Sequence, residues 1–185
     1  MTRSTLWLCA FALGTLLATT PLMAAPDVRP IASVDLDRYA GRWFEIAKYP
    51  NRFQKDCVAD TTAEYALRPD GRVTVTNRCR QADGSMKEAV GIARWREQPP
   101  RDATLKVRFA PAWLSFVPQV WGDYWILALP ADYRYVVVGE PSRKYLWILS
   151  RTPQMTTGDY EEALAAATAN GYDTAKLVKT PQGAR

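Results

Sequence analysis

Apolar and polar positions alternate along much of the chain beyond residue 60. Between residues 72 and 80, Val73, Val75 and Cys79 share one face, while threonine and arginine side chains occupy the other. Residues 104–109 repeat this pattern, with leucine, valine and phenylalanine opposite lysine and arginine. A period of two residues predicts β-strands with one dry face and one wet face.

Turn signals separate these stretches at short intervals. Pro69-Asp70-Gly71 and Asp83-Gly84 are strong hairpin markers, and further proline-containing breaks follow them. The eight predicted strands are residues 43–49, 61–68, 72–80, 87–95, 104–109, 124–129, 133–139 and 145–151. Because all connections are short, an all-β, eight-stranded antiparallel up-and-down barrel is the expected fold, since closure removes exposed strand edges. A two-sheet sandwich is the alternative on pattern alone.

One α-helix is predicted near the end of the chain. Thr156 can cap its start, and Asn170-Gly171 can end it. Tyr160, Leu164 and Ala167 share one face, so the helix should pack against the outside of the barrel. Residues 176–180 are expected to form a short final strand.

Residues 1–24 have the features of a signal peptide. Arg3 supplies a positive start, residues 6–17 are apolar, and small residues precede position 26. The apolar stretch is shorter than the ~20 residues that a membrane-spanning helix needs. Residues 25–185 are therefore expected to form a single exported domain, in the periplasm or associated with the outer membrane. Cys9 lies inside the apolar stretch, after bulky residues, so no lipid anchor is expected.

Composition excludes several classes of function. The chain has no histidine, which removes Ser-His-Asp and Cys-His catalysis and the commonest metal ligand. No glycine-rich phosphate loop is present, and no catalytic residue, metal ligand or cofactor is predicted. The net charge of +5 is scattered rather than gathered into a basic stripe, so no nucleic-acid partner is expected.

Cysteine usage agrees with export. Once Cys9 is removed with the signal peptide, Cys57 and Cys79 remain as a pair in an oxidising compartment. A disulfide between them is expected, with two buried free thiols as the alternative.

The interior positions predicted by alternation are apolar, aromatic or small. Ala89, Gly91 and Ala93 are small enough to leave volume for a ligand, whereas Tyr135 and Val137 are assigned to the inner face of the seventh strand. In the sixth strand the inward set is either Tyr124, Ile126 and Ala128 or Trp125, Leu127 and Leu129. The residues predicted to bind a ligand are Tyr65, Val75, Asn77, Ala93, Val107, Phe109, Trp113, Phe116, Tyr145 and Trp147.

Two further features suggest roles at the barrel mouth. Glu45 lies on an otherwise apolar strand, where it could hydrogen-bond a ligand headgroup or, alternatively, pair with a lysine near the rim. Residues 111–122 form a proline-bounded loop that is rich in aromatic and other apolar residues, where polar residues would be expected. This loop is expected to be a lip over the mouth or a docking patch for a membrane or a second copy of the chain. A loop that buries its own aromatic side chains is the alternative.

Three short motifs occur in a characteristic order. Gly41-Arg42-Trp43-Phe44 opens the first strand, Ala131-Asp132-Tyr133 precedes the seventh, and Leu149-Ser150-Arg151-Thr152 follows the eighth. The set resembles the three conserved blocks of the lipocalins over roughly residues 35–180. The strings GRWFEIAKYPNRFQ and YLWILSRTP narrow the likeness to bacterial outer-membrane lipocalins and their apolipoprotein D-like relatives.

The resemblance implies a function and a structural element. It implies binding of long-chain fatty acids or lysophospholipids and a role in envelope maintenance. It also implies that Gly41, Trp43 and Arg151 form the closed end of the barrel, with the guanidinium packed over the indole. A lipid- or isoprenoid-modifying enzyme in the same barrel is one alternative. A protein-interaction module that uses the 111–122 loop, including a homodimer, is another.

Overall fold

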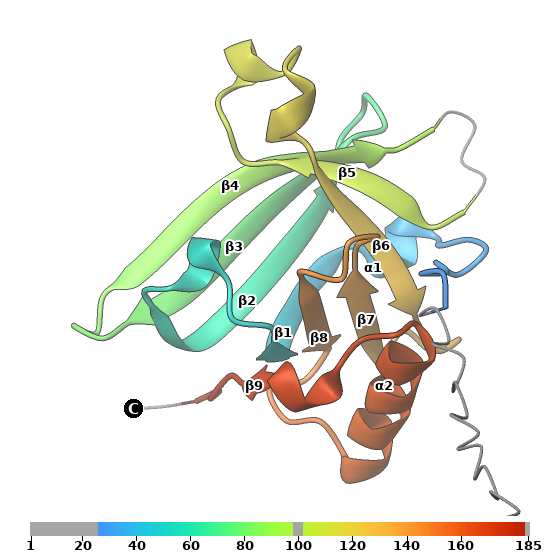
Figure 1. The fold of residues 1–185 in the computed structure, drawn as a ribbon. Coiled ribbons are helices and arrows are strands. Elements are labelled where there is room, and N and C mark those ends of the chain that lie inside the picture. The colour runs from blue at the N-terminus through green and yellow to red at the C-terminus, as the bar shows by residue number, and fades with distance from the viewer. Residues whose placement is uncertain (1–25, 98–101, 184–185) are drawn as a thin grey trace, which may run out of the picture.

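The computed structural model describes residues 26–97 and 102–183, so the expected signal peptide lies outside the described residues. Figure 1 shows a curved antiparallel sheet with one long helix against its outside. The strands are β1 (Gly41–Lys48), β2 (Cys57–Leu67), β3 (Val73–Gln81), β4 (Met86–Trp95), β5 (Thr104–Arg108), β6 (Gly122–Ala128), β7 (Tyr135–Gly139), β8 (Leu146–Ser150) and β9 (Val178–Lys179). The α-helices are α1 (Leu36–Tyr39) and α2 (Thr157–Ala169), and short 3₁₀ turns include η1 (Arg52–Gln54), η2 (Ala112–Leu114), η3 (Pro118–Val120) and η4 (Thr174–Lys176).

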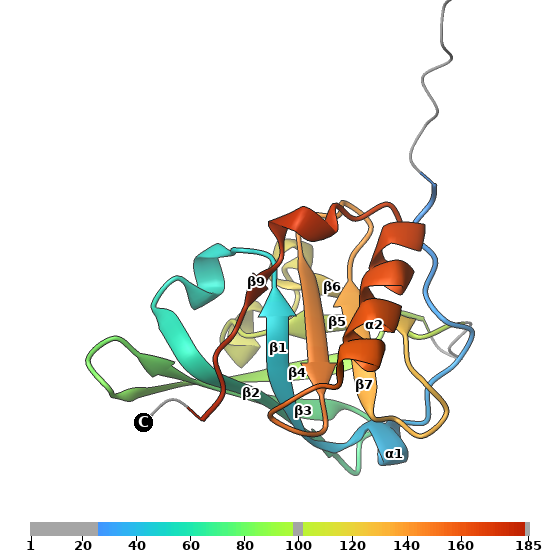
Figure 2. The same cartoon turned by 90° about the horizontal axis from the view of Figure 1, so that it is seen from below.

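The first eight strands form the predicted closed barrel. The strand order is β2-β3-β4-β5-β6-β7-β8-β1-β9, and an additional β1–β2 pairing joins the two ends of the eight-stranded series. β9 pairs with Ala47 and Lys48 of β1 outside this barrel, as Figure 2 shows from below. Every predicted strand is therefore present, with shifts of a few residues at the ends.

The barrel is uneven in height because β2, β3 and β4 extend beyond their neighbours. β4 pairs with β5 only from Ile92 onward, whereas its pairing with β3 continues to Met86. In the extended part, the predicted disulfide joins Cys57 of β2 to Cys79 of β3, with 5.5 Å between the Cα atoms. The disulfide therefore holds together two strands that have no partner from β1 at this level.

Helix α2 packs on the outside of the barrel, as predicted. Thr156 caps it by accepting a hydrogen bond from the backbone N–H of Asp159. Ala163 and Ala167 are fully buried in an apolar cluster between the helix and the outer face of the barrel, together with Val137 of β7 and Ile148 of β8. The small alanine side chains let the helix approach the sheet closely.

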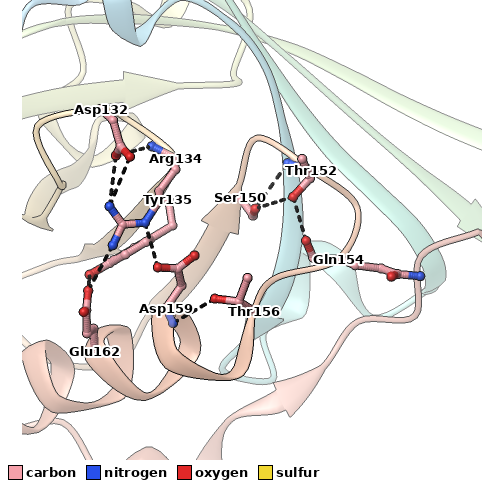
Figure 3. Close-up of polar contacts among 9 residues, drawn as sticks. All are labelled: Asp132, Arg134, Tyr135, Ser150, Thr152, Gln154, Thr156, Asp159 and Glu162. Carbon is pink, nitrogen blue, oxygen red and sulfur yellow. Dashed lines mark hydrogen bonds and ion pairs between the residues drawn. The ribbon is translucent and has the colours of Figure 1, made fainter.

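An arginine beside β7 ties the barrel to α2. The guanidinium of Arg134 lies 2.6 Å from Asp159 and 3.3 Å from Glu162 of the helix, and 3.1 Å from Asp132. The Tyr135 hydroxyl donates to Glu162 at 3.0 Å (Figure 3). These contacts lie at the surface, so they orient the helix more than they stabilise it.

The interior assignment of β7 by sequence was wrong. Tyr135 and Val137 face α2, whereas Val136 and Val138 face the barrel interior. The error has a physical cause: both faces of β7 are buried, so no polar side chain marks the outer face. The ambiguity in β6 is resolved by a register shift between Ile126 and Ala128, which places Tyr124, Ile126 and Leu129 inside and Leu127 outside.

The end of the barrel at which β1 begins is organised around Arg151 and Trp43. The Arg151 guanidinium lies 3.8 Å from the centroid of the Trp43 ring, and Trp43 is fully buried. The same guanidinium donates to the backbone carbonyls of Arg38 and Ala40 at 2.7 and 3.0 Å. Gly41 has a φ of +91°, which lets the chain turn from α1 into β1 beneath Arg151.

We expect Arg151→Lys to lower the free energy of unfolding by about 2–3 kcal/mol. Lysine keeps the charge but loses the planar fork that reaches several carbonyls and stacks on the indole. Urea denaturation monitored by circular dichroism measures the change. Arg42→Lys, at an exposed arginine of the same end, is the matched control and should change stability by less than about 0.5 kcal/mol. Equal effects at both positions would contradict the role given to Arg151.

Candidate ligand-binding site

The barrel interior contains a small, apolar-walled cavity. Its volume is about 10 Å³, close to the room that one water molecule needs. Four of the predicted ligand-binding residues line it: Tyr65, Val75, Ala93 and Val107. The other lining residues, which the predicted site omitted, are Leu36, Tyr39, Val73, Leu105 and Tyr124.

Three tyrosine hydroxyls meet at this cavity. The Tyr124 hydroxyl of β6 lies 2.5 Å from that of Tyr39 and 2.9 Å from that of Tyr65 on β2. Since β6 and β2 are not neighbours in the sheet, Tyr124 reaches across the interior. Burial raises the pKa of Tyr65 to about 12 and holds the pKa values of Tyr39 and Tyr124 well above 10. The cluster thus provides neutral hydroxyl groups in an otherwise apolar lining.

Two of these tyrosines were absent from the predicted site for separate reasons. Tyr39 belongs to α1, before the first strand, so strand alternation assigns it no face. Tyr124 was one of two options in a strand whose register shifts. A large aromatic residue just before the Gly41 turn was the available signal for Tyr39.

Two other residues predicted to bind a ligand, Phe109 and Asn77, do not line this cavity. Phe109 is 43 % exposed, and its ring lies where a Cβ atom on Gly91 would stand, within 2.7 Å. Asn77 is half-buried and pairs with Ala63 on one side and Ala89 on the other. The Phe109 ring therefore occupies the space that a side chain at position 91 would fill, and Gly91 does not leave open volume for a ligand.

A stack of aromatic rings forms part of the mouth. The Tyr145 and Trp147 rings are 5.8 Å apart and nearly parallel, and Phe53 of the β1–β2 loop lies 5.7 Å from Tyr145. The Trp147 indole donates to Gln54 at 3.0 Å, which ties this stack to the loop. Tyr145 and Trp147 are thus brought together, as neighbours of Phe53.

Glu45 is buried and fully engaged in hydrogen bonds. Its carboxylate accepts from Gln54 and from Thr180, each at 2.6 Å, and lies 3.0 Å from the Lys48 ammonium. The backbone carbonyl of Glu45 accepts from Gln182, which also donates to Thr61 where β1 and β2 separate. Glu45 therefore fixes the mouth loop and the C-terminal segment, and pairing with a lysine is the alternative that the geometry shows.

The 111–122 loop does not line the cavity. Trp113 is 72 % exposed and Phe116 is 78 % exposed, and neither belongs to the cavity lining. Figure 1 shows the loop, with η2 and η3, rising away from the sheet above β5. Trp121 holds its base, donating from the indole to the Ser115 carbonyl at 2.9 Å. Trp113 and Phe116 were predicted to contact the ligand. In the structure the loop that carries them projects outward instead of folding over the mouth, and neither residue lines the cavity.

Within residues 26–97 and 102–183, no group of three potential ligands among His, Cys, Asp and Glu could hold a metal ion. Within the same ranges, no helix combines the length and hydropathy needed to cross a bilayer.

Comparison with known proteins agrees with this barrel. Residues 34–182 match the family described as "Lipocalin-like domain". The chain is 42 % identical over 157 residues to temperature-induced lipocalin-1 of Arabidopsis thaliana, covering 84 % of this chain and 83 % of the relative. It is 38 % identical over 156 residues to the outer membrane lipoprotein Blc of Escherichia coli K12, with the same coverage. Insecticyanin of the tobacco hornworm superposes with a TM-score of 0.63 at 23 % identity, covering 85 % of each chain.

An eight-stranded antiparallel barrel with an apolar interior and one external helix defines the class of small-ligand-binding barrel proteins. The chain belongs to the lipocalin family, whose members bind small hydrophobic ligands. The likeness to insecticyanin concerns the fold alone.

The tyrosine cluster predicts a loss of stability at alkaline pH. Below pH 10 the three phenols are protonated in both the folded and the unfolded chain, and their contribution is complete. Above pH 10 the unfolded chain releases a proton that folded Tyr65 keeps until about pH 12, so the free energy of unfolding falls.

Tyr65→Phe isolates this effect. Between pH 9 and pH 11 the variant should lose about 1 kcal/mol less stability than the unmodified protein, because one pKa unit corresponds to ~1.4 kcal/mol. Urea unfolding at the two pH values gives the comparison. Identical losses in the two proteins would show that Tyr65 ionises as freely when folded as when unfolded.

Proposed function

We propose that this protein binds one long-chain fatty acid or lysophospholipid in its barrel and carries it within the bacterial cell envelope. The observation that supports this most directly is the interior itself. Val73, Val75, Ala93 and Leu105 form an apolar wall around the cavity and are themselves buried. Such a wall suits an acyl chain, for which each buried methylene contributes about 0.8 kcal/mol.

Binding requires side chains to move. Ligand pockets commonly enclose ~300 Å³ or more, whereas this cavity measures about 10 Å³. Phe109 is the side chain best placed to move, because it rests on Gly91 and is already 43 % exposed. Its rotation out of the mouth would open the space above Ala93 and Val107 without altering a hydrogen bond.

A role as a carrier rather than an enzyme follows from the chemistry of the interior. The chain has no histidine, and the one buried carboxylate of β1, Glu45, is occupied by Lys48, Gln54 and Thr180. A general base and a nucleophile in one cleft are therefore not assembled. The neutral tyrosine hydroxyls can hydrogen-bond a ligand oxygen but are poor bases while their pKa values remain high.

Location in the envelope is supported by three observations. Residues 1–24 have the pattern of a signal peptide, and a relative at 38 % identity is named an outer membrane lipoprotein. The disulfide between Cys57 and Cys79 fits an oxidising compartment. We therefore propose that the protein is exported and acts in the periplasm, in association with the outer membrane.

Ligand binding is tested by filling the cavity. We expect Ala93→Leu to weaken quenching of tryptophan fluorescence by oleic acid and by lysophosphatidylcholine at least tenfold, because Ala93 faces the cavity and is only 4 % exposed. Ala66→Leu, at an exposed alanine of β2, is the matched control and should bind as the unmodified protein does. Native mass spectrometry of the purified protein should show an adduct with the mass of a fatty acid or lysolipid. An adduct-free mass, with no quenching by either lipid, would contradict the proposal.

The exposed loop supports direct contact with a membrane. Trp113 and Phe116 are the two most exposed large apolar side chains among the described residues, and both lie on the same proline-bounded loop. Exposed apolar groups of this kind mark contact sites, and aromatic rings favour the membrane interface. We propose that the loop touches the bilayer from which the ligand is taken.

We expect the double substitution Trp113→Ser and Phe116→Ser to reduce binding to phosphatidylcholine vesicles at least tenfold in a sedimentation assay. Val178→Ser removes a 52 % exposed apolar side chain from β9 and should leave binding unchanged. If instead the double substitution leaves vesicle binding intact but converts a dimer to a monomer in size-exclusion chromatography, the loop is a contact between two copies of the chain.

A further inference from the structure

Three arginines, Arg94, Arg96 and Arg108, lie on the outer side of β4 and β5. Arg94 belongs to β4, Arg96 follows that strand, and Arg108 ends β5. Among the described residues no carboxylate forms an ion pair with any of them. Asp123 of β6, on the same face, is engaged by Lys106 at 2.7 Å. This face of the barrel therefore carries uncompensated positive charge.

Arg108 is the unusual member of this group because it is buried. Arg108 is only 6 % exposed, and its Nη1 atom donates a hydrogen bond to the Ala110 carbonyl. The Nε atom is enclosed and has no hydrogen-bond partner. Nε and Nη2 share the edge of a guanidinium that binds carboxylates and phosphates through two parallel hydrogen bonds. Burying a charge without a counter-charge is costly, so an anion that meets this edge, after the side chains covering Nε have moved, would relieve a cost already present in the fold.

Trp121 lies between Arg108 and Arg94. Its ring centroid is 5.3 Å from the Arg108 guanidinium and 4.2 Å from that of Arg94. The same indole donates to Ser115 and so holds the base of the loop that carries Trp113 and Phe116. Trp121 therefore connects the exposed Arg94 and the buried Arg108 to the loop that carries the exposed aromatic residues.

The structure assigns this surface, Arg94, Arg108 and Trp121, as a site for the phosphate of an anionic phospholipid in a bilayer. The inference rests on the membrane contact proposed above and deepens it by naming the lipid class. Charge complementarity favours an anionic headgroup, and continuity with Trp113 and Phe116 favours a bilayer over a soluble anion. Arg96, whose guanidinium lies 5.4 Å from the Trp125 ring, adds charge beside Arg94 and Arg108.

The site predicts that anionic lipid strengthens binding through specific arginines. Vesicles of phosphatidylcholine are compared with vesicles containing about 30 % phosphatidylglycerol, using the full exported chain. Anionic vesicles should bind at least tenfold more tightly. Arg94→Gln should reduce that advantage about fivefold, the factor that ~1 kcal/mol for one arginine near the membrane corresponds to. It should leave binding to phosphatidylcholine unchanged.

Two further variants make the test specific. Arg72→Gln removes the same charge from the exposed turn between β2 and β3 and should change binding by less than twofold. Arg108→Lys keeps the charge but loses the Nε and Nη2 edge, which can form two parallel hydrogen bonds to a phosphate. This variant should also reduce the preference for anionic lipid. Because Arg108 is buried, the thermal unfolding of the Arg108→Lys variant is measured together with its vesicle binding. Arg94 is exposed, so its variant tests the site independently of folding.

The outcomes separate this inference from the proposals on which it rests. Equal loss of anionic-vesicle binding in Arg94→Gln and Arg72→Gln would overturn the site, as would equal binding to the two kinds of vesicle. In the second case, loss of binding on substitution of Trp113 and Phe116 would still support the membrane contact. Inorganic phosphate that changes tryptophan fluorescence at millimolar concentration, without preference for anionic vesicles, would identify a soluble-ion site and overturn the bilayer assignment. Failure to bind either vesicle would overturn the membrane contact itself. It would leave the proposed ligand binding in the barrel untouched, because native mass spectrometry tests that separately.

Discussion

The packing of Arg151 over Trp43 is the contact on which the rest of the barrel depends. Trp43 is fully buried at the start of β1, and the guanidinium above it binds carbonyls of the turn that leads into that strand. The contact thus joins the end of β8 to the beginning of β1, where the sheet must close. Tyr39, whose ring lies 5.0 Å from that of Trp43, also lines the apolar cavity, so the same contact positions one wall of the candidate site.

Much of this architecture could be predicted from the pattern of residues. Alternation and turn signals gave all eight barrel strands, and the capping residue Thr156 located α2. The pattern failed on β7 because Val136 and Val137 are both fully buried, one against the interior and the other against the helix. Alternation reports a difference between two environments, and here both environments are apolar.

The ligand site was predicted less completely than the fold. Tyr65, Val75, Ala93 and Val107 lie together as alternation implied, but Tyr39 and Tyr124 depend on a short helix and a register shift. Trp113 and Phe116 illustrate another limit: a sequence shows that a loop is apolar but not the direction in which it projects. Likewise, the environment of Arg108 appears only when Trp121 and Ala110 are in place around it. Polar groups whose partners come from distant segments are the least accessible to sequence reasoning.

The same closure has a kinetic consequence. The hydrogen bond from Arg151 to the carbonyl of Arg42 joins residues 109 positions apart. Contacts of such long range form late and slow the folding of β-rich chains. Until β8 meets β1, each of these strands presents an unpaired edge to other chains, and unpaired edges promote aggregation. A chain of this topology is therefore exposed to aggregation during the whole interval before β8 meets β1.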